Sequence, residues 1–211
     1  MNLPTKITFS RIVATIVMLI TLFVLSIVKP TITTIGNTPL TWLNIALFVF
    51  FVIASYTDHL DGKIARSRNM VTDLGKFLDP IADKLLVNSL VIFLSIPGVL
   101  FAGQIAFPYW CAIILVLRDI IVDALRFMAA TKGRVIGANI FGKLKTVLEM
   151  VCIGAILLND FPFSYFDSSW IEPLRITNIL VYLATIASVV SGAIYLVNNK
   201  DVFVGETDGK K

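Results

Sequence analysis

Charged residues are scarce in this sequence, and their scarcity excludes several classes of protein. Only 15% of the 211 residues carry a charge, whereas a soluble domain usually contains about 25%. Hydrophobic residues make up 57% of the chain. This composition argues against a soluble globule, against a disordered chain and against a nucleic-acid-binding module, whose basic surface needs polar surroundings. Of the classes considered, the composition is compatible with a membrane protein.

Cysteine and histidine are scarcer still. The two cysteines, Cys111 and Cys152, lie in apolar runs and have no CxxC pattern or histidine beside them. We interpret both as small packing residues, because isolated cysteines in apolar segments lack the partners of a redox or metal site. The chain has one histidine, His59, which bears on the acidic motif described below.

Long apolar runs are what the sequence has in abundance. Since one membrane span needs about 20 residues, the composition predicts an all-α integral membrane protein with six transmembrane helices. The mixed apolar and polar segment 1–11 predicts a short amino-terminal interfacial helix, although it could equally be a flank of the first span. The six runs are Ile12–Val28, Trp42–Tyr56, Leu85–Leu100, Phe107–Leu125, Leu144–Leu158 and Ile176–Val197.

The basic residues predict the orientation of these spans. On a six-span chain only Lys29 and Arg175, of 18 lysines and arginines, fall on the outer side. The positive-inside rule therefore places both termini in the cytoplasm of a cell-membrane protein. No internal repeat is visible, so we predict a single domain over residues 1–211, with 198–211 as a cytoplasmic tail.

Four aspartates stand at helical spacings in the segment 55–84. Asp58 and Asp61 are three residues apart, and Asp79 and Asp83 are four apart. On two packed helices these spacings place each pair on one face, so all four carboxylates could point into one cavity. Such crowding requires compensating cations, and an all-oxygen ligand set favours Mg²⁺, Mn²⁺ or Ca²⁺. Paired carboxylates suit a two-metal phosphoryl-transfer site.

Small and basic residues accompany the aspartates. Gly62 follows Asp61, and Gly75 precedes Asp79 by one turn, so a backbone or a ligand could approach closely at both. Arg66 carries a fork of donors suited to a phosphate. Thr72, in the polar turn between the two predicted helices, could contact a ligand phosphate or cap the second helix.

The motif Asp58-x2-Asp61-Gly62-x2-Ala65-Arg66-x8-Gly75-x3-Asp79-x3-Asp83 resembles the signature of the CDP-alcohol phosphatidyltransferase family. The resemblance implies a six-helix membrane enzyme, commonly a homodimer, with a polar cavity open to the cytoplasm. In that cavity a CDP-activated lipid gives its phosphatidyl group to an alcohol and releases CMP.

The resemblance also implies a role for each motif residue. The four aspartates would bind Mg²⁺ or Mn²⁺, with Asp83 also acting as the general base. His59 occupies a variable position of the motif, and we interpret it as a bystander. The residues expected to bind the CDP-lipid are Gly62, Ala65, Arg66 and Thr72 of the motif, and Asn2, Thr5 and Thr8 near the amino terminus.

The flanking sequence bears on which alcohol is used. The amino-terminal residues, the segment from Arg118 to Thr146 and Ser191-Gly192-x2-Tyr195 are similar to the family branch that uses sn-glycerol 3-phosphate. That resemblance implies CDP-diacylglycerol as donor and phosphatidylglycerol phosphate as product. Asp119 and Glu149 depart from it, standing where we expect Glu and Gln. The cations expected to hold the acceptor phosphate are Arg118, Lys143, Arg126 and Lys145.

Two alternatives stay open on sequence. The first keeps the chemistry but uses another acceptor, such as inositol phosphate or serine; an acceptor without a phosphate would leave Arg118 and Lys143 without a ligand. The second is a divalent-cation transporter that passes ions across the aspartates. A transporter is expected to show internal symmetry between its halves, and none is visible here.

Overall fold

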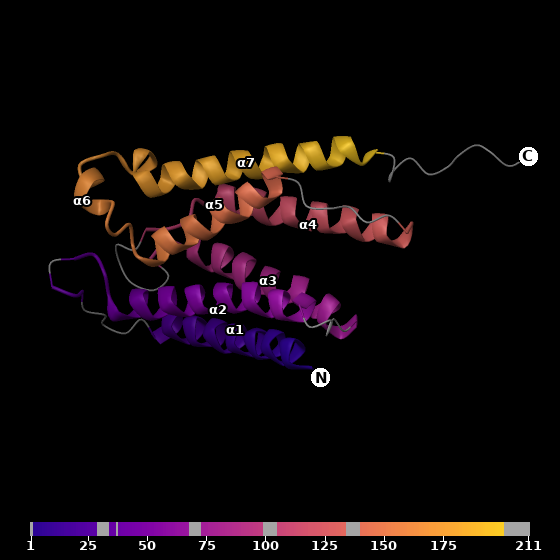
Figure 1. Cartoon of the computed structure of the whole chain (residues 1–211). Coiled ribbons are helices and arrows are strands. Elements are labelled where there is room, and N and C mark those ends of the chain that lie inside the picture. The colour runs from indigo at the N-terminus through magenta and orange to yellow at the C-terminus, as the bar shows by residue number, and fades with distance from the viewer. Residues whose placement is uncertain are drawn as a thin grey trace, which may run out of the picture. The chain divides into compact units, whose positions relative to one another are not determined.

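A computed structural model describes residues 2–28, 34–36, 38–67, 73–98, 105–133 and 140–200. Within helices, the side chains of residues 3–4, 59–67, 73–74 and 76–77 are not among those described. The described chain is helical (Figure 1). Its elements are α1 (Leu3–Val28), α2 (Trp42–Ser67), α3 (Asp73–Leu94), α4 (Tyr109–Thr131), α5 (Ile140–Leu157), the short α6 (Ser164–Asp167), the 3-10 helix η1 (Glu172–Leu174) and α7 (Ile176–Asn198).

The all-α prediction is confirmed, since each of the six apolar runs overlaps one long helix. The amino-terminal segment differs from the prediction in one respect. Helix α1 continues without a break through Arg11, so residues 3–11 form its first turns rather than a separate helix. Nothing in the segment stops a helix, because its proline, Pro4, lies in the first turn, where the missing N–H costs nothing.

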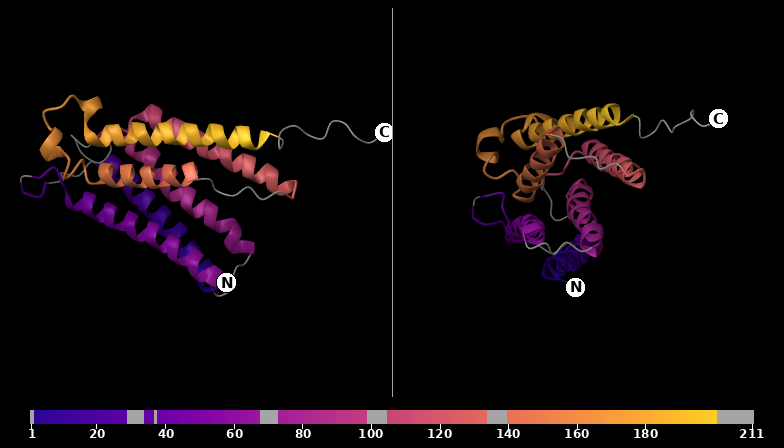
Figure 2. Two further views of the ribbon diagram at one scale, coloured as in Figure 1. Left: turned by 45° about the horizontal axis from the view of Figure 1, so that its top comes forward. Right: turned by 45° about the vertical axis from the view of Figure 1, so that its right-hand side comes forward.

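Two compact units are formed by the chain. The first comprises Met1–Phe107 and Ile153–Trp170, and the second comprises Pro108–Cys152 and Ile171–Lys211. In the first unit, α1, α2 and α3 pack side by side (Figure 2). Apolar side chains between them are fully buried, among them Leu22, Leu90 and Val91. The second unit is built on α4 and α7, which pack against each other.

Asparagine side chains tie the ends of helices together in the first unit. Thr41 and Asn44 form a reciprocal cap at the start of α2: the Asn44 backbone N–H donates to Thr41 Oγ1 (3.2 Å), and the Thr41 N–H donates to Asn44 Oδ1 (3.0 Å). Asn44 Nδ2 also donates to the Leu157 carbonyl (2.7 Å). Asn159 accepts from the Ile105 N–H (2.8 Å). These bonds satisfy buried groups that no helix ladder reaches.

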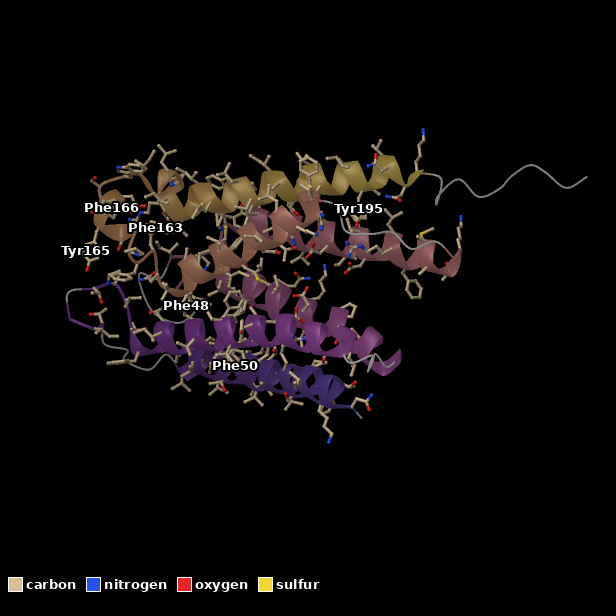
Figure 3. All side chains as sticks on the ribbon, in the orientation of Figure 1. Phe48, Phe50, Phe163, Tyr165, Phe166 and Tyr195 are labelled. Carbon is tan, nitrogen blue, oxygen red and sulfur yellow. The ribbon has the colours of Figure 1, made fainter. Side chains whose placement is uncertain are left out.

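Aromatic and apolar side chains cover much of the described surface. Phe163, Tyr165 and Phe166 gather at α6 (Figure 3). On α1, Phe23 is 62% exposed and Ile27 is 66% exposed, as expected of a helix that faces lipid rather than water. Among the described residues, the helical stretches Thr5–Val28 and Ile176–Asn198 are long and apolar enough to cross a membrane, and Trp42–Asp58 is a shorter apolar stretch.

Candidate active site

Asp58 of the acidic motif is paired with a buried cation of α1. Arg11 Nη1 lies 2.5 Å from Asp58 Oδ1. The Arg11 side chain is only 3% exposed, whereas that of Asp58 is 38% exposed. A guanidinium is costly to bury without a carboxylate partner, so the sequence of α1 requires an acid at this place. Asp58 is therefore held by α1, and part of its side chain stays exposed.

Asp79 of α3 is also contacted from α1. The Thr8 hydroxyl donates to Asp79 Oδ1 (2.9 Å). Thr8 and Arg11 are three residues apart, so one face of α1 reaches both acidic helices. Asp79 and Asp83 lie one turn apart on α3, and both are half-buried. Pro80 lies between them in the interior of α3, where its ring removes one backbone donor from the helix ladder.

Part of the predicted site lies outside the residues that the structure describes. Thr72 is outside the described residues, and so are the side chains of Asp61, Ala65 and Arg66 and the surroundings of Gly62. Gly75 is half-buried on α3. Asn2 is exposed just before α1, whereas Thr5 and Thr8 are buried within it. The structure thus brings Thr8, Arg11, Asp58 and Asp79 together in the first unit.

The donor set of this site fits a hard divalent cation. Asp58, Asp79 and Asp83 offer only carboxylate oxygen, the ligand type that Mg²⁺ and Mn²⁺ prefer. Among the described side chains no group of three metal-ligating residues is assembled. The side chain of Asp61, the fourth expected ligand, is not among those that the structure describes.

All four predicted acceptor cations belong to the second unit. Lys143 of α5 is exposed. Arg126 of α4 donates from Nη2 to the Tyr195 hydroxyl (3.1 Å), and its guanidinium carbon lies 5.2 Å from the centre of that ring. Tyr195 projects from α7 (Figure 3) and is 2% exposed. Cation–π contact and hydrogen bond together hold Arg126 against α7.

Arg118 and Lys145 belong to a buried ionic network. Arg118 Nη1 lies 3.1 Å from Asp119 Oδ1. Lys145 Nζ lies 2.8 Å from Asp119 Oδ1, 2.9 Å from Asp119 Oδ2 and 2.6 Å from Glu149 Oε2. The four side chains carry two charges of each sign, so the network is neutral. Neutrality and mutual hydrogen bonding are what allow these groups to lie inside an apolar helical unit.

Sequence reasoning missed two kinds of residue that the structure places here. Arg11 has no assigned role in the sequence prediction, although its helical spacing from Thr8 indicates that the two residues share one face of a helix. Ser188 is not in the sequence prediction, and Ser191 stands there in a flanking motif without a role; both contact Arg118 from α7. Polar and small residues in an otherwise apolar helix were the signal that could have found them.

Together these features define a helical protein with apolar helices of membrane length and a carboxylate-bearing helix pair. The model of the family described as CDP-alcohol phosphatidyltransferase matches residues 1–192, and the chain belongs to that family of enzymes. This membership confirms the resemblance found in the acidic motif and favours a transferase over a cation transporter.

Relatives match over most of their length. Three are named CDP-diacylglycerol--glycerol-3-phosphate 3-phosphatidyltransferase. The protein from Bacillus subtilis is 35% identical over 201 residues, covering 94% of this chain and 95% of the relative. That from Rickettsia bellii is 33% identical over 210 residues, covering 96% and 97%. That from Mycoplasma pneumoniae is 37% identical over 172 residues, covering 77% and 71%.

Proposed function

We propose that this chain transfers the phosphatidyl group of CDP-diacylglycerol to sn-glycerol 3-phosphate and releases phosphatidylglycerol phosphate and CMP. One observation carries the proposal. The similarity to the Bacillus subtilis protein of that name covers 94% of this chain and 95% of the relative. The acidic motif and the cations of the second unit both lie inside that length, so the similarity includes the residues proposed for the donor and those proposed for the acceptor.

In the proposed reaction, the acceptor hydroxyl oxygen forms a bond to the lipid-side phosphorus of the pyrophosphate. The bond from that phosphorus to the oxygen of CMP breaks, and the hydroxyl proton moves to the Asp83 carboxylate as general base. Mg²⁺ or Mn²⁺ held by Asp58, Asp61, Asp79 and Asp83 would offset the negative charge of the pyrophosphate. Arg11 and Thr8 support this arrangement because they hold Asp58 and Asp79 from a third helix.

The CDP-lipid is proposed to bind along the start of α1 and the motif of α2. The Thr8 contact with Asp79 supports this, because it places the first turns of α1 beside an acidic residue of α3. Residues proposed to contact the donor are Asn2, Thr5, Thr8, Gly62, Ala65, Arg66 and Thr72, with Gly75 allowing a close backbone approach.

The acceptor phosphate is proposed to bind Arg118 and Lys143. Arg118 is supported by its geometry: its side chain is 13% exposed, and a guanidinium suits the oxygens of a phosphate. Lys143 is exposed and adds a second positive charge on α5. Arg126 is an additional candidate, although it already contacts Tyr195. An acceptor without a phosphate, such as serine, would give these cations no phosphate to bind.

For the membrane arrangement we keep the sequence prediction as a proposal. We propose six transmembrane helices in the cell membrane, both termini and a polar cavity on the cytoplasmic side, and a homodimer. The exposed apolar rows on α1 and α7 support helices in lipid. The concentration of basic residues at one set of helix ends supports the orientation.

The test is acceptor-dependent CMP release. Purified protein in detergent micelles receives CDP-diacylglycerol, Mg²⁺ or Mn²⁺, and either labelled sn-glycerol 3-phosphate, inositol phosphate or serine. We expect CMP and labelled lipid only with glycerol 3-phosphate, and loss of both when EDTA replaces the metal. Equal or greater turnover with inositol phosphate or serine would assign a different acceptor, and no CMP with any of them would refute the transferase.

A further inference from the structure

Arg118 is held from α7 by residues that the acceptor prediction does not include. Its Nη2 donates to Ser191 Oγ (2.6 Å), and its Nε donates to the Ser188 carbonyl (3.2 Å). The Arg118 stem passes over Gly192: a Cβ added there would lie 3.1 Å from Arg118 Cγ. Within the described part of the chain, α7 thus offers this one side chain a hydroxyl, a carbonyl and, at the buried Gly192, a place without a side chain.

Asp119, the carboxylate that accepts a hydrogen bond from Arg118, is itself held by a residue of α5. Asp119 accepts from Arg118 Nη1 and, with both oxygens, from Lys145 Nζ. Lys145 also donates to Glu149 Oε2. An ammonium has three N–H donors, and these three oxygens match them. Lys145 therefore has no donor left for a substrate phosphate, and its side chain is only 3% exposed.

The guanidinium of Arg118 differs from the ammonium of Lys145 in the number of N–H donors that its contacts use. It has five N–H donors, and its contacts with Ser188, Asp119 and Ser191 use one on each nitrogen. One donor on Nη1 and one on Nη2 are left over within the described part of the chain. Two donors on the terminal nitrogens of one rigid plane are the arrangement that binds a phosphate through two oxygens.

We propose that Ser191, Gly192 and Lys145 are positioning residues that hold the Arg118 guanidinium for the acceptor phosphate. Ser191 orients Nη2, Gly192 leaves room for the stem, and Lys145 acts through Asp119, which it holds in place. This inference rests on the proposed function, since it assigns Arg118 to the phosphate of the acceptor. It gives Lys145 a supporting role where the sequence predicted direct phosphate contact.

Serine variants provide a matched test. Ser191→Ala removes the hydroxyl that accepts from Nη2, and Ser191→Thr retains one. Ser188→Ala is the control, because Arg118 is bound by the Ser188 backbone carbonyl, which alanine keeps. We expect Ser191→Ala to raise the KM for glycerol 3-phosphate about tenfold, the range of a hydrogen bond to a charged group. The KM for CDP-diacylglycerol should change less than twofold, and Ser191→Thr should recover most of the loss.

The variant Gly192→Ala distinguishes a positioning role of Gly192 from a role in the stability of the protein. Alanine favours a helix more than glycine does, and the crowded neighbour is a flexible side chain that can shift. We therefore expect the melting temperature of Gly192→Ala to be unchanged or higher while the KM for glycerol 3-phosphate rises. A merely structural role would lower the melting temperature and leave the ratio of the two KM values unchanged.

The outcomes distinguish this inference from the proposed function. If the unmodified enzyme gives no CMP with glycerol 3-phosphate, the proposed function fails. If the enzyme is active but Ser191→Ala and Gly192→Ala keep the acceptor KM of Ser188→Ala, the positioning role is refuted. A rise in both KM values together with a lower melting temperature would also refute it.

Discussion

Replacing Lys145 by methionine should destabilise the protein strongly. The lysine is 3% exposed and contacts two carboxylates whose side chains are 4% and 3% exposed. Lys145→Met keeps most of the length of the side chain but leaves Asp119 and Glu149 with no ammonium between them. Removing one partner of a buried ion network costs about 3–5 kcal/mol of folding free energy. For a chain of this size that corresponds to a drop in Tm of about 6–20 °C.

Two further variants make this measurement decisive. Lys143→Met removes a lysine two positions earlier on the same helix that is exposed, so its Tm should change by less than about 2 °C. The double variant Lys145→Met with Glu149→Leu removes one charge of each sign and should recover at least half of the loss. Thermal unfolding in detergent micelles, followed by circular dichroism at 222 nm, gives all three values. A Tm for Lys145→Met equal to that of Lys143→Met would refute the reasoning.

Two other predictions concern turnover. Asp83→Asn should lower kcat at least about 100-fold, because an amide cannot accept the hydroxyl proton. The control Glu172→Gln changes an exposed carboxylate and should leave kcat unchanged. Full activity in Asp83→Asn would show that Asp83 is not the general base. Lys143→Ala should raise the KM for glycerol 3-phosphate more than that for CDP-diacylglycerol, with Lys200→Ala as the exposed-lysine control. The reverse order would move Lys143 to the nucleotide.

The helical fold was readable from the sequence because apolar runs of membrane length leave the backbone few alternatives to a helix. Each predicted run overlaps a helix. The amino-terminal segment was predicted less well: a mixture of apolar and polar residues is compatible both with an interfacial helix and with the first turns of α1. Contacts across helices decide that question, since Thr8 and Arg11 are buried against Asp79 and Asp58.

The sequence by itself determined the family and its chemistry, because the aspartate and glycine spacings from Asp58 to Asp83 are local and can be read directly along the chain. Only the tertiary structure decided how the cations differ. Arg118, Lys143 and Lys145 look alike in sequence, as positive residues in or beside apolar runs. Packing places Lys145 between two carboxylates and holds Arg118 against Ser191 of α7, 73 residues away. The number of donors that a cation has left for a substrate depends on such distant partners, and no spacing along the chain records them.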